Sequence, residues 1–435
     1  MRPTPHASAP SALQLQRAKN AVYVLFFVIG FVFANWASRL PAVRDALHYE
    51  PAQMGRLLLV GAIGSVIALP VSGWINQRLG SKRAIQSAMV LFAGGYLLVA
   101  LSVGQLPIGV TALGLFIGGV GMGICDTSMN LEGARVERVL GQSIMPRFHG
   151  AFSLGTMAGA LIGAALAHFG VTVAAHVSTA VVAGFAAIMV AVLSLLPREL
   201  NVAEVQVEPS PADCDQTASP GQAATVGLND SGVSTQPQPS VWSAWTSGRT
   251  WLIGVIVLAA ALTEGAANDW LALGIVDGFG VNDSFGAFGL FVFLSAMTAG
   301  RFVGTHILDQ YGRLVVLRLC AVFALIGLVL FGLAPWMWLA LVGAALWGVG
   351  ASLGFPIGMS AASDDPRTAA ARLSVVATIG YTAFFAGPPL LGELATHIGY
   401  RHAMLAIMVP AVIGLLVSGA AKEDRHTAAP HNAGA

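Results

Sequence analysis

The sequence predicts an all-α membrane protein in which twelve transmembrane helices form two six-helix bundles related by a pseudo-two-fold axis. Three observations lead to this prediction. Of the 435 residues, 56% are apolar and only 10% are charged, whereas soluble domains carry about 25% charged residues. The chain contains twelve apolar runs of the length, about 20 residues, that a membrane-spanning helix needs. Short motifs of the first half recur in the second half at a nearly constant separation.

The composition also excludes several classes of protein. A formal net charge of +1 gives no basic field that would attract nucleic acid. The three cysteines, Cys125, Cys214 and Cys320, show neither a disulfide framework nor the spacing of a metal site. We therefore expect no nucleic-acid partner, no metal and no cofactor. The 51 glycines favour helices packed closely in lipid.

The twelve predicted spans are bounded by charged or turn-forming residues. In the first half they are 20–40, 54–76, 84–103, 106–130, 149–167 and 173–196. In the second half they are 250–274, 285–308, 314–333, 335–360, 372–392 and 400–420. The first run is too long for a removable signal peptide and lacks a small-residue cleavage site, so it is expected to remain as a helix.

A polar stretch between the two sets of spans predicts the domain organisation. Residues 199–248 are rich in Pro, Ser, Gln and acidic residues, as expected of a flexible linker. The linker separates an N-terminal bundle at 20–198 from a C-terminal bundle at 249–420, with tails at 1–19 and 421–435. An even number of spans places both tails and the linker on one side of the membrane.

The basic residues predict which side this is. Eighteen of the 22 Lys and Arg residues fall on the side of the termini, and the other side holds only Arg39, Arg44, Arg56 and Arg401. Cytoplasmic loops carry the excess of Lys and Arg. The sequence therefore predicts a multi-pass protein of a bacterial-type inner (plasma) membrane, with both termini in the cytoplasm.

The two halves share motifs in the same order, which indicates parallel repeats. A Trp is followed 19 residues later by a Gly in both halves, and a Gly-Val-Gly motif recurs after 229 residues. The matching pairs are Trp36 with Trp270, Gly55 with Gly289, Gly119 with Gly348, and Gly170 with Gly399.

The loop after the second span carries a more specific pattern. It reads Gly-Trp-Ile-Asn-Gln-Arg-Leu-Gly-Ser-Lys-Arg over residues 73–83 and resembles the loop signature of the major facilitator superfamily. Gln77 stands where that signature has an acid, and the second copy, at 309–313, keeps the acid. The glycines permit close packing and a turn, and the bases hold the cytoplasmic face. The resemblance implies gating roles for Gly73, Arg78, Gly80 and Arg83, and for Asp309 and Arg313 in the second copy.

Four longer segments narrow the resemblance to the rhizopine-transporter-like (MosC-like) branch of this superfamily. They are 35–41, 126–130, 148–155 and 264–270, and the resemblance covers almost the whole chain outside the tails and the linker. It implies the major facilitator fold and the transport of a small polar solute.

Glu264 is the most central acid of the chain. It lies about 13 residues into its span, roughly 20 Å at 1.5 Å per residue. A charged carboxylate at this depth costs about 2.5–3.5 kcal/mol even on the lenient insertion scale, so Glu264 should face a cavity or hold a proton. We predict that Glu264 couples transport to protons; the alternative is a neutral side chain that packs against a neighbouring helix.

Two further acids are predicted to take part in proton coupling. Asp126 is followed by Asn130 one helical turn later, so both present one polar face, and Asp126 serves either coupling or a gating salt bridge. Asp269 follows Glu264 by five residues and lies closer to the outer surface, where hydration is the alternative to function. Asn268 shares the helical face of Glu264 and is the better candidate for a cavity.

The remaining candidates are predicted to contact solute or to form a gate. The predicted solute-binding residues are Asn35, Trp36, Arg39, Asn130, Asn268, Trp270 and Tyr381. For the two tryptophans, stacking on a sugar-like ring competes with a place in the aromatic belt at the membrane interface. His149 is assigned to the inner gate, where it either titrates near neutral pH or packs.

These features together predict a secondary active transporter that moves a small polar solute, such as a sugar, cyclitol or amine, by alternating access with coupling to protons. The alternative is a proton-coupled drug or metabolite efflux antiporter, although residues 148–170 lack the proline of the efflux pattern. An enzyme is disfavoured because HExxH and GxSxG motifs are absent. A sensor is disfavoured because the linker and tails are too polar and short to fold a domain. No obligate protein partner is expected.

Overall fold

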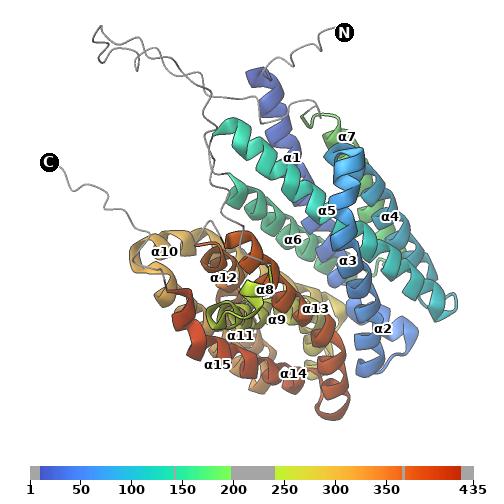
Figure 1. Ribbon diagram of the computed structural model, residues 1–435. Helices are drawn as coiled ribbons and strands as arrows, with labels where there is room; N and C mark the ends of the chain where they lie inside the picture. The colour runs from blue at the N-terminus through green and yellow to red at the C-terminus, as the bar shows by residue number, and fades with distance from the viewer. Residues whose placement is uncertain (1–9, 142–143, 197–240, 365–367, 423–435) are drawn as a thin grey trace, which may run out of the picture.

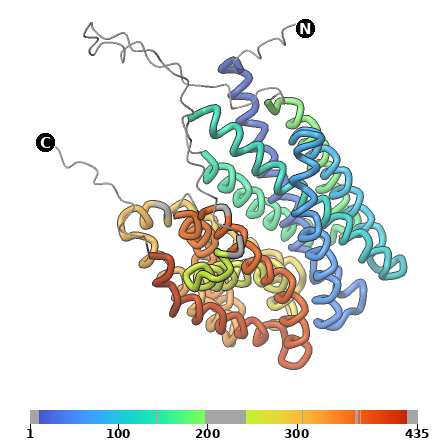
Figure 2. Tube along the Cα trace, viewed as in Figure 1, coloured from blue at the N-terminus to red at the C-terminus, as the bar shows by residue number. Residues whose placement is uncertain are grey.

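The computed structural model describes residues 10–141, 144–196, 241–364 and 368–422, and all regular elements in these ranges are helices. Twelve helical stretches are long and apolar enough to cross a membrane. They form two bundles, the first half of the chain in blue to green and the second in yellow to red (Figures 1 and 2). The predicted all-α class with twelve spans is confirmed.

Between residues 10 and 196, as far as these are described, the first bundle contains seven helices. They are α1 (Ala12–Ala37), α2 (Leu40–Leu47), α3 (Pro51–Leu79), α4 (Ser81–Ser102), α5 (Ile108–Leu140), α6 (Met145–His168) and α7 (Val173–Val192). Of these, α2 is too short to span and follows α1 at the end of the bundle opposite to the chain termini.

The second bundle begins with a short helix inside the predicted linker. Its helices are α8 (Val241–Trp245), α9 (Gly248–Phe279), α10 (Asp283–Leu333), α11 (Met337–Ala351), α12 (Gly354–Ala362), α13 (Ala369–Ile398), α14 (Tyr400–Ala403) and α15 (Met408–Val417). Two 3₁₀ turns, Met404–Ile407 and Ser418–Ala421, complete the last span. The rest of the predicted linker, up to residue 240, lies outside the described residues, as do residues 1–9 and 423–435 of the predicted tails.

Two of the differences from the predicted spans have local chemical reasons. Helix α1 starts at Ala12 because Ser11 and Gln14 form a capping box, which satisfies backbone groups well before the apolar run begins. The predicted span 335–360 is broken at Ser352 and Leu353 into α11 and α12. Pro356 has no N–H to donate to the Ser352 carbonyl four residues earlier, so the helical ladder is interrupted there.

Glycine contacts show that the two halves repeat each other in packing as well as in sequence. A methyl group on Gly119 of α5 would lie 2.1 Å from the carbonyl oxygen of Gly61 in α3. A methyl group on Gly348 of α11 would lie 2.3 Å from the carbonyl oxygen of Phe293 in α10. Gly80 and Gly312 also turn the chain with nearly equal φ angles, +76° and +77°. The same backbone approaches therefore occur in both halves.

The halves meet along two pairs of helices, α3 with α13 and α6 with the first part of α10. Between α3 and α13 the main chains nearly touch. A methyl group on Gly55 would lie 2.5 Å from the Pro388 carbonyl oxygen, and one on Gly392 would lie 2.6 Å from the Pro51 carbonyl oxygen. Pro388 and Pro389 lie inside α13 without ending it. At these two points the interface is therefore made of backbone.

Candidate functional site

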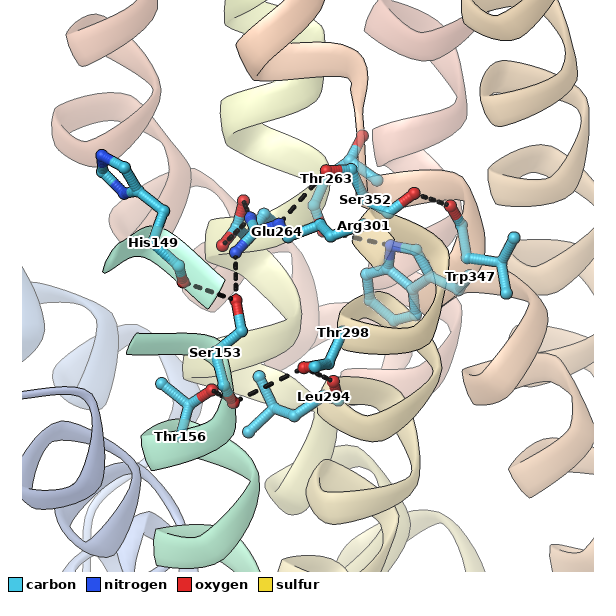
Figure 3. A network of polar contacts seen from close by, with 11 residues as sticks. His149, Ser153, Thr156, Thr263, Glu264, Leu294, Thr298, Arg301, Trp347 and Ser352 are labelled. Carbon is cyan, nitrogen blue, oxygen red and sulfur yellow. Dashed lines mark hydrogen bonds and ion pairs between the residues drawn. The ribbon is translucent and has the colours of Figure 1, made fainter. Parts of the chain in front are cut away.

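Arg301 of α10 is the centre of a polar network between the two bundles (Figure 3). Its Nη2 donates to both carboxylate oxygens of Glu264 in α9, at 3.1 and 3.0 Å. Its Nη1 donates to the Ser153 hydroxyl of α6 at 2.9 Å, and its Nε donates to the Ser352 carbonyl at 3.2 Å. The guanidinium thus connects α9, α6 and the end of α11.

The break after α11 supplies one of these acceptors. Because Pro356 cannot bond the Ser352 carbonyl, that oxygen is available to Arg301. The Ser352 hydroxyl bonds back to the Val349 carbonyl at 2.7 Å. A single proline in α12 therefore creates a fixed backbone acceptor for the central arginine.

Ser153 belongs to the first bundle and joins it to the second. Besides accepting from Arg301, its hydroxyl donates to the His149 carbonyl at 3.2 Å. Its own carbonyl accepts from Thr156 at 2.8 Å and from Thr298 of α10 at 3.5 Å. The His149 ring is exposed, lies edge-on to Phe26 with 5.1 Å between the ring centroids, and interacts electrostatically with Arg301 and Glu264.

The sequence analysis singles out Glu264 and His149 but misses Arg301. Arg301 falls near the inner end of the predicted span 285–308 and is counted there with the basic residues on the side of the termini. The structure places it in an apolar span, Asp283–Gly304, with a side chain only 22% exposed. The sequence does contain a signal for Arg301, because an arginine inside an apolar run has a free-energy cost in the membrane. The same cost singles out Glu264.

Asp126 and Asn130 form a second polar group on α5, within the electrostatic reach of Tyr381 in α13. The Asn130 amide donates to the Asp126 carboxylate at 3.2 Å and to its carbonyl at 2.8 Å. Tyr381 lies close enough to Asp126 to interact with its charge. Asp126 and Asn130, which are predicted to share one face of α5, are therefore in direct contact.

Asp269 and Asn268 lie on different sides of α9. Asp269 lines a cavity of about 10 Å³ together with Gly265, Phe384 and Pro388, between α9 and α13. A space of this size holds about one water molecule. The Oδ1 atom of Asn268 is buried and accepts no hydrogen bond from the described residues.

Asn35 and Arg39 are held inside the first bundle. The Asn35 Oδ1 lies 2.6 Å from the His176 Nε2, and the Arg39 Nη2 donates to the Val171 carbonyl at 2.7 Å. Burial lowers the pKa of the Arg39 guanidinium, and Asp283 partly opposes this shift. In this conformation both side chains bond to their own bundle.

Trp36 and Trp270 are covered by protein. Trp36 packs edge-on to Tyr96 and is 5% exposed, and Trp270 packs against Tyr400 and is fully buried. Neither ring reaches the outer surface of the bundle in this conformation.

The predicted gating residues of the two signature loops lie at the end of the bundles where the chain termini are, away from the central network. Gly73, Arg78, Arg83 and Asp309 are exposed. The Arg78 guanidinium lies 4.5 Å from the centre of the Trp74 ring. Arg313 bonds Asp364 at 2.5 Å within the second bundle.

An ion pair joins the two bundles at the opposite end. The Arg44 Nη1 of α2 lies 2.5 Å from the Asp277 carboxylate of α9. Nearby, the Ala52 N–H of α3 donates to the Thr396 hydroxyl of α13 at 3.1 Å. Burial acts to lower the pKa of Arg44, but hydrogen bonds to Asp277 and Asp45 raise it above its usual value. We call these contacts, formed by Arg44, Asp277, Ala52 and Thr396, the distal closure.

Removal of the Arg44 charge is expected to loosen the distal closure. Asp277 is 40% exposed, so the ion pair is worth about 1 kcal/mol at most, or about a fivefold shift between closed and open states. In a cysteine-free background, the variant Arg44→Ala should slow disulfide formation between cysteines introduced at Ala52 and Thr396. The swap Arg44→Asp with Asp277→Arg should restore it. An unchanged rate in Arg44→Ala would show that the ion pair does not hold this end closed.

Within the described part of the chain, no group of three His, Cys, Asp or Glu side chains is placed to hold a metal ion. The chemistry available at the centre is instead that of a carboxylate and a guanidinium that share a partly exposed space with a histidine and a serine. Such groups can bind a polar solute and exchange protons.

The described residues form twelve apolar spans in two repeated bundles, with a partly buried ion pair that contacts the other bundle through Ser153 and a closure at one end; these are the features of a membrane transport protein. The family model of the Major Facilitator Superfamily matches residues 22–388. The chain belongs to this superfamily.

Relatives of known sequence agree with the predicted branch. The chain is 29% identical over 396 residues to the transporter y4wD of Sinorhizobium fredii, covering 88% of this chain and 95% of y4wD. It is 27% identical over 410 residues to the membrane protein MosC of Rhizobium meliloti, covering 94% of this chain and 90% of MosC. The resemblance to MosC-like proteins is therefore confirmed.

Solved structures share the fold at low sequence identity. The nucleoside transporter NupG has a TM-score of 0.67 at 14% identity, covering 94% of this chain and 98% of NupG. The fucose:proton symporter FucP of E. coli has a TM-score of 0.58 at 15% identity, covering 93% of this chain and 98% of the FucP chain. At such identities these likenesses concern the fold alone.

Proposed function

We propose that the protein is a secondary active transporter that carries a small polar solute by alternating access and couples this movement to protons. The observation that supports this proposal is the Glu264–Arg301 ion pair, which is partly exposed and contacts the other bundle through Ser153. A carboxylate between two moving bundles changes its surroundings during transport, so it can bind and release a proton in each cycle.

The proposed orientation follows from the charge distribution. With the termini in the cytoplasm of an inner membrane, the distal closure faces outward and the structure is closed to the outside. The Asp126 group and the Asp269 cavity are proposed as further binding sites for the proton or the solute. Asn35, Arg39 and the two tryptophans are proposed to reach solute only in another state of the cycle.

The proposal is tested by solute-induced proton movement. Purified protein in liposomes that enclose a pH-sensitive dye is exposed to sugars, cyclitols, amines and organic acids. We expect at least one solute to change the internal pH, and we expect a protonophore to abolish the change. Liposomes without protein are the control. A solute that accumulates with no proton movement would contradict the coupling and leave facilitated transport.

A further inference from the structure

We infer that Arg301 binds an anionic group of the solute, such as a carboxylate, and that this group takes the place of Glu264 on the guanidinium when Glu264 becomes protonated. The inference rests on the proposed function above and deepens it, because it names the class of solute. The solute would be a monoanion that enters together with one proton.

The two partners of the ion pair are held very differently. Arg301 keeps two acceptors besides Glu264, the Ser153 hydroxyl and the Ser352 carbonyl, and the second of these is fixed by the break at Pro356. Within the described residues, every hydrogen bond to the Glu264 carboxylate comes from Arg301 Nη2. The carboxylate is therefore the partner that can leave, and the guanidinium is the partner that stays.

Protonation of Glu264 leaves a charge without a counterion. The pair is neutral as it stands, because one negative and one positive group face each other. When the carboxylate takes up a proton, the guanidinium remains charged inside a membrane span, and an unpaired charge in such surroundings is strongly unfavourable. An anion of the solute restores neutrality, so proton and anion stabilise each other's binding.

The neighbouring charged groups have positions or partners of their own, so we assign the role of counterion to Arg301 to the solute. On the helices around the pair, His149 of α6 lies close enough to interact electrostatically with Arg301 and Glu264, and its carbonyl accepts a hydrogen bond from Ser153. Asp126 belongs to the group with Asn130, within the electrostatic reach of Tyr381, and Asp269 lies in its own cavity against α13. Helices α11 and α15 contain no ionisable side chain.

The charged groups at the two ends of the bundles have other partners. Asp364 pairs with Arg313 and Arg249 at the end of the termini. Asp277 pairs with Arg44 at the other end. The carboxylate that pairs with Arg301 is that of Glu264. We therefore expect an anion from solution to replace the Glu264 carboxylate on Arg301.

Other charge types fit the site less well. A cationic solute would have to remove Arg301 from Glu264, although the guanidinium is anchored by the Ser352 carbonyl. A neutral solute would leave the guanidinium without a counterion once Glu264 is protonated. The pair is also accessible, because the side chains of Arg301 and Glu264 are 22% and 24% exposed.

Acetate tests the site without knowledge of the natural solute. The variant Glu264→Gln imitates the protonated carboxyl, so its Arg301 should accept acetate at pH 7.5. We expect acetate at about 50 mM to raise the melting temperature of purified Glu264→Gln by about 3 °C, a stabilisation typical of a ligand well above its dissociation constant. Acetamide, which has nearly the same shape without the charge, should have no such effect.

Two comparisons assign the effect to Arg301. The double variant Glu264→Gln with Arg301→Gln should lose the response to acetate but keep any general effect of salt. The wild-type protein, in which the Glu264 carboxylate occupies Arg301, should respond to acetate less than Glu264→Gln at pH 7.5, and this measurement needs no variant of Arg301. The inference is overturned by an equal response in the single and double variants, or by an equal response to acetate and acetamide.

The result for the anion site at Arg301 can be distinguished from the result for the proposed function. In the liposome assay, glucuronate and glucose form a matched pair that differs in charge, and we expect only glucuronate-like acids to drive proton movement. Proton movement driven by a neutral sugar and lost in Glu264→Gln, with no acetate response, would keep the proposed function and overturn the anion site. An acetate response through Arg301 without solute-driven proton movement would support the anion site and contradict the coupling.

Discussion

Replacement of Glu264 by glutamine is expected to reduce solute-driven proton movement at least tenfold, while exchange of solute across the membrane continues. Glutamine keeps the shape of the side chain but carries no exchangeable proton, so the solute moves without its coupling ion. Without a proton to move with it, the solute should no longer accumulate against its gradient. The measurement is proton movement and solute counterflow in the same liposomes.

Glu393→Gln is the matched control for this prediction. Glu393 undergoes the same chemical change on α13 of the same bundle, but its side chain is 63% exposed and lies near His397, outside the central network. We expect this variant to behave as wild type. If Glu264→Gln concentrated solute at the wild-type rate and with the wild-type pH dependence, Glu264 would have a packing role. The coupling role would then pass to Asp126 or Asp269.

Replacement of Gly95 by alanine is expected to destabilise the first bundle by about 1–3 kcal/mol, the range for overpacking. A methyl group there would lie 2.3 Å from the Gly118 nitrogen and 2.5 Å from the Gly114 carbonyl oxygen. These are backbone atoms of α5, so the two helices must move apart. We expect a clearly lower melting temperature of the purified protein and a lower yield of monodisperse material.

The neighbouring residue provides a control one position away. Gly94 is exposed on α4, and a methyl group on it would meet no atom within 4 Å. Because alanine favours helix over glycine by up to about 1 kcal/mol, Gly94→Ala should be neutral or slightly stabilising. Equal melting temperatures for the two variants would show that the close approach of α4 and α5 does not limit stability.

The twelve spans could be predicted because a membrane helix is defined by a property of the chain itself, the length of an apolar run. The repeat could be predicted because glycines at helix crossings are required wherever backbones nearly touch, as at Gly119 and Gly348. Helix α2 and the break at Ser352 were missed, since both depend on local backbone bonding. Pro356 was the available sign of that break.

The site was predicted less completely because a sequence shows which residues share a helical face but not which neighbour covers that face. Glu264 could be found from the cost of its charge in lipid. Its partner Arg301 lies 37 residues away on another helix, and nothing in the pattern of α9 indicates the register between the two helices. For the same reason the contact between Asn35 and His176 could not be predicted, and the assignment of Asn35 to solute stays a prediction.

The backbone interface between α3 and α13 has a consequence for the speed of the transport cycle. At Gly55, which faces Pro388, and at Gly392, which faces Pro51, the two helices meet through backbone atoms and not through long side chains that interlock. The bundles can therefore separate at these two points without a change of side-chain rotamers, and we expect the polar contacts of the distal closure to contribute to the barrier to opening. Turnover should then respond more steeply to changes at Arg44 or Thr396 than to conservative changes within the lipid-facing helices.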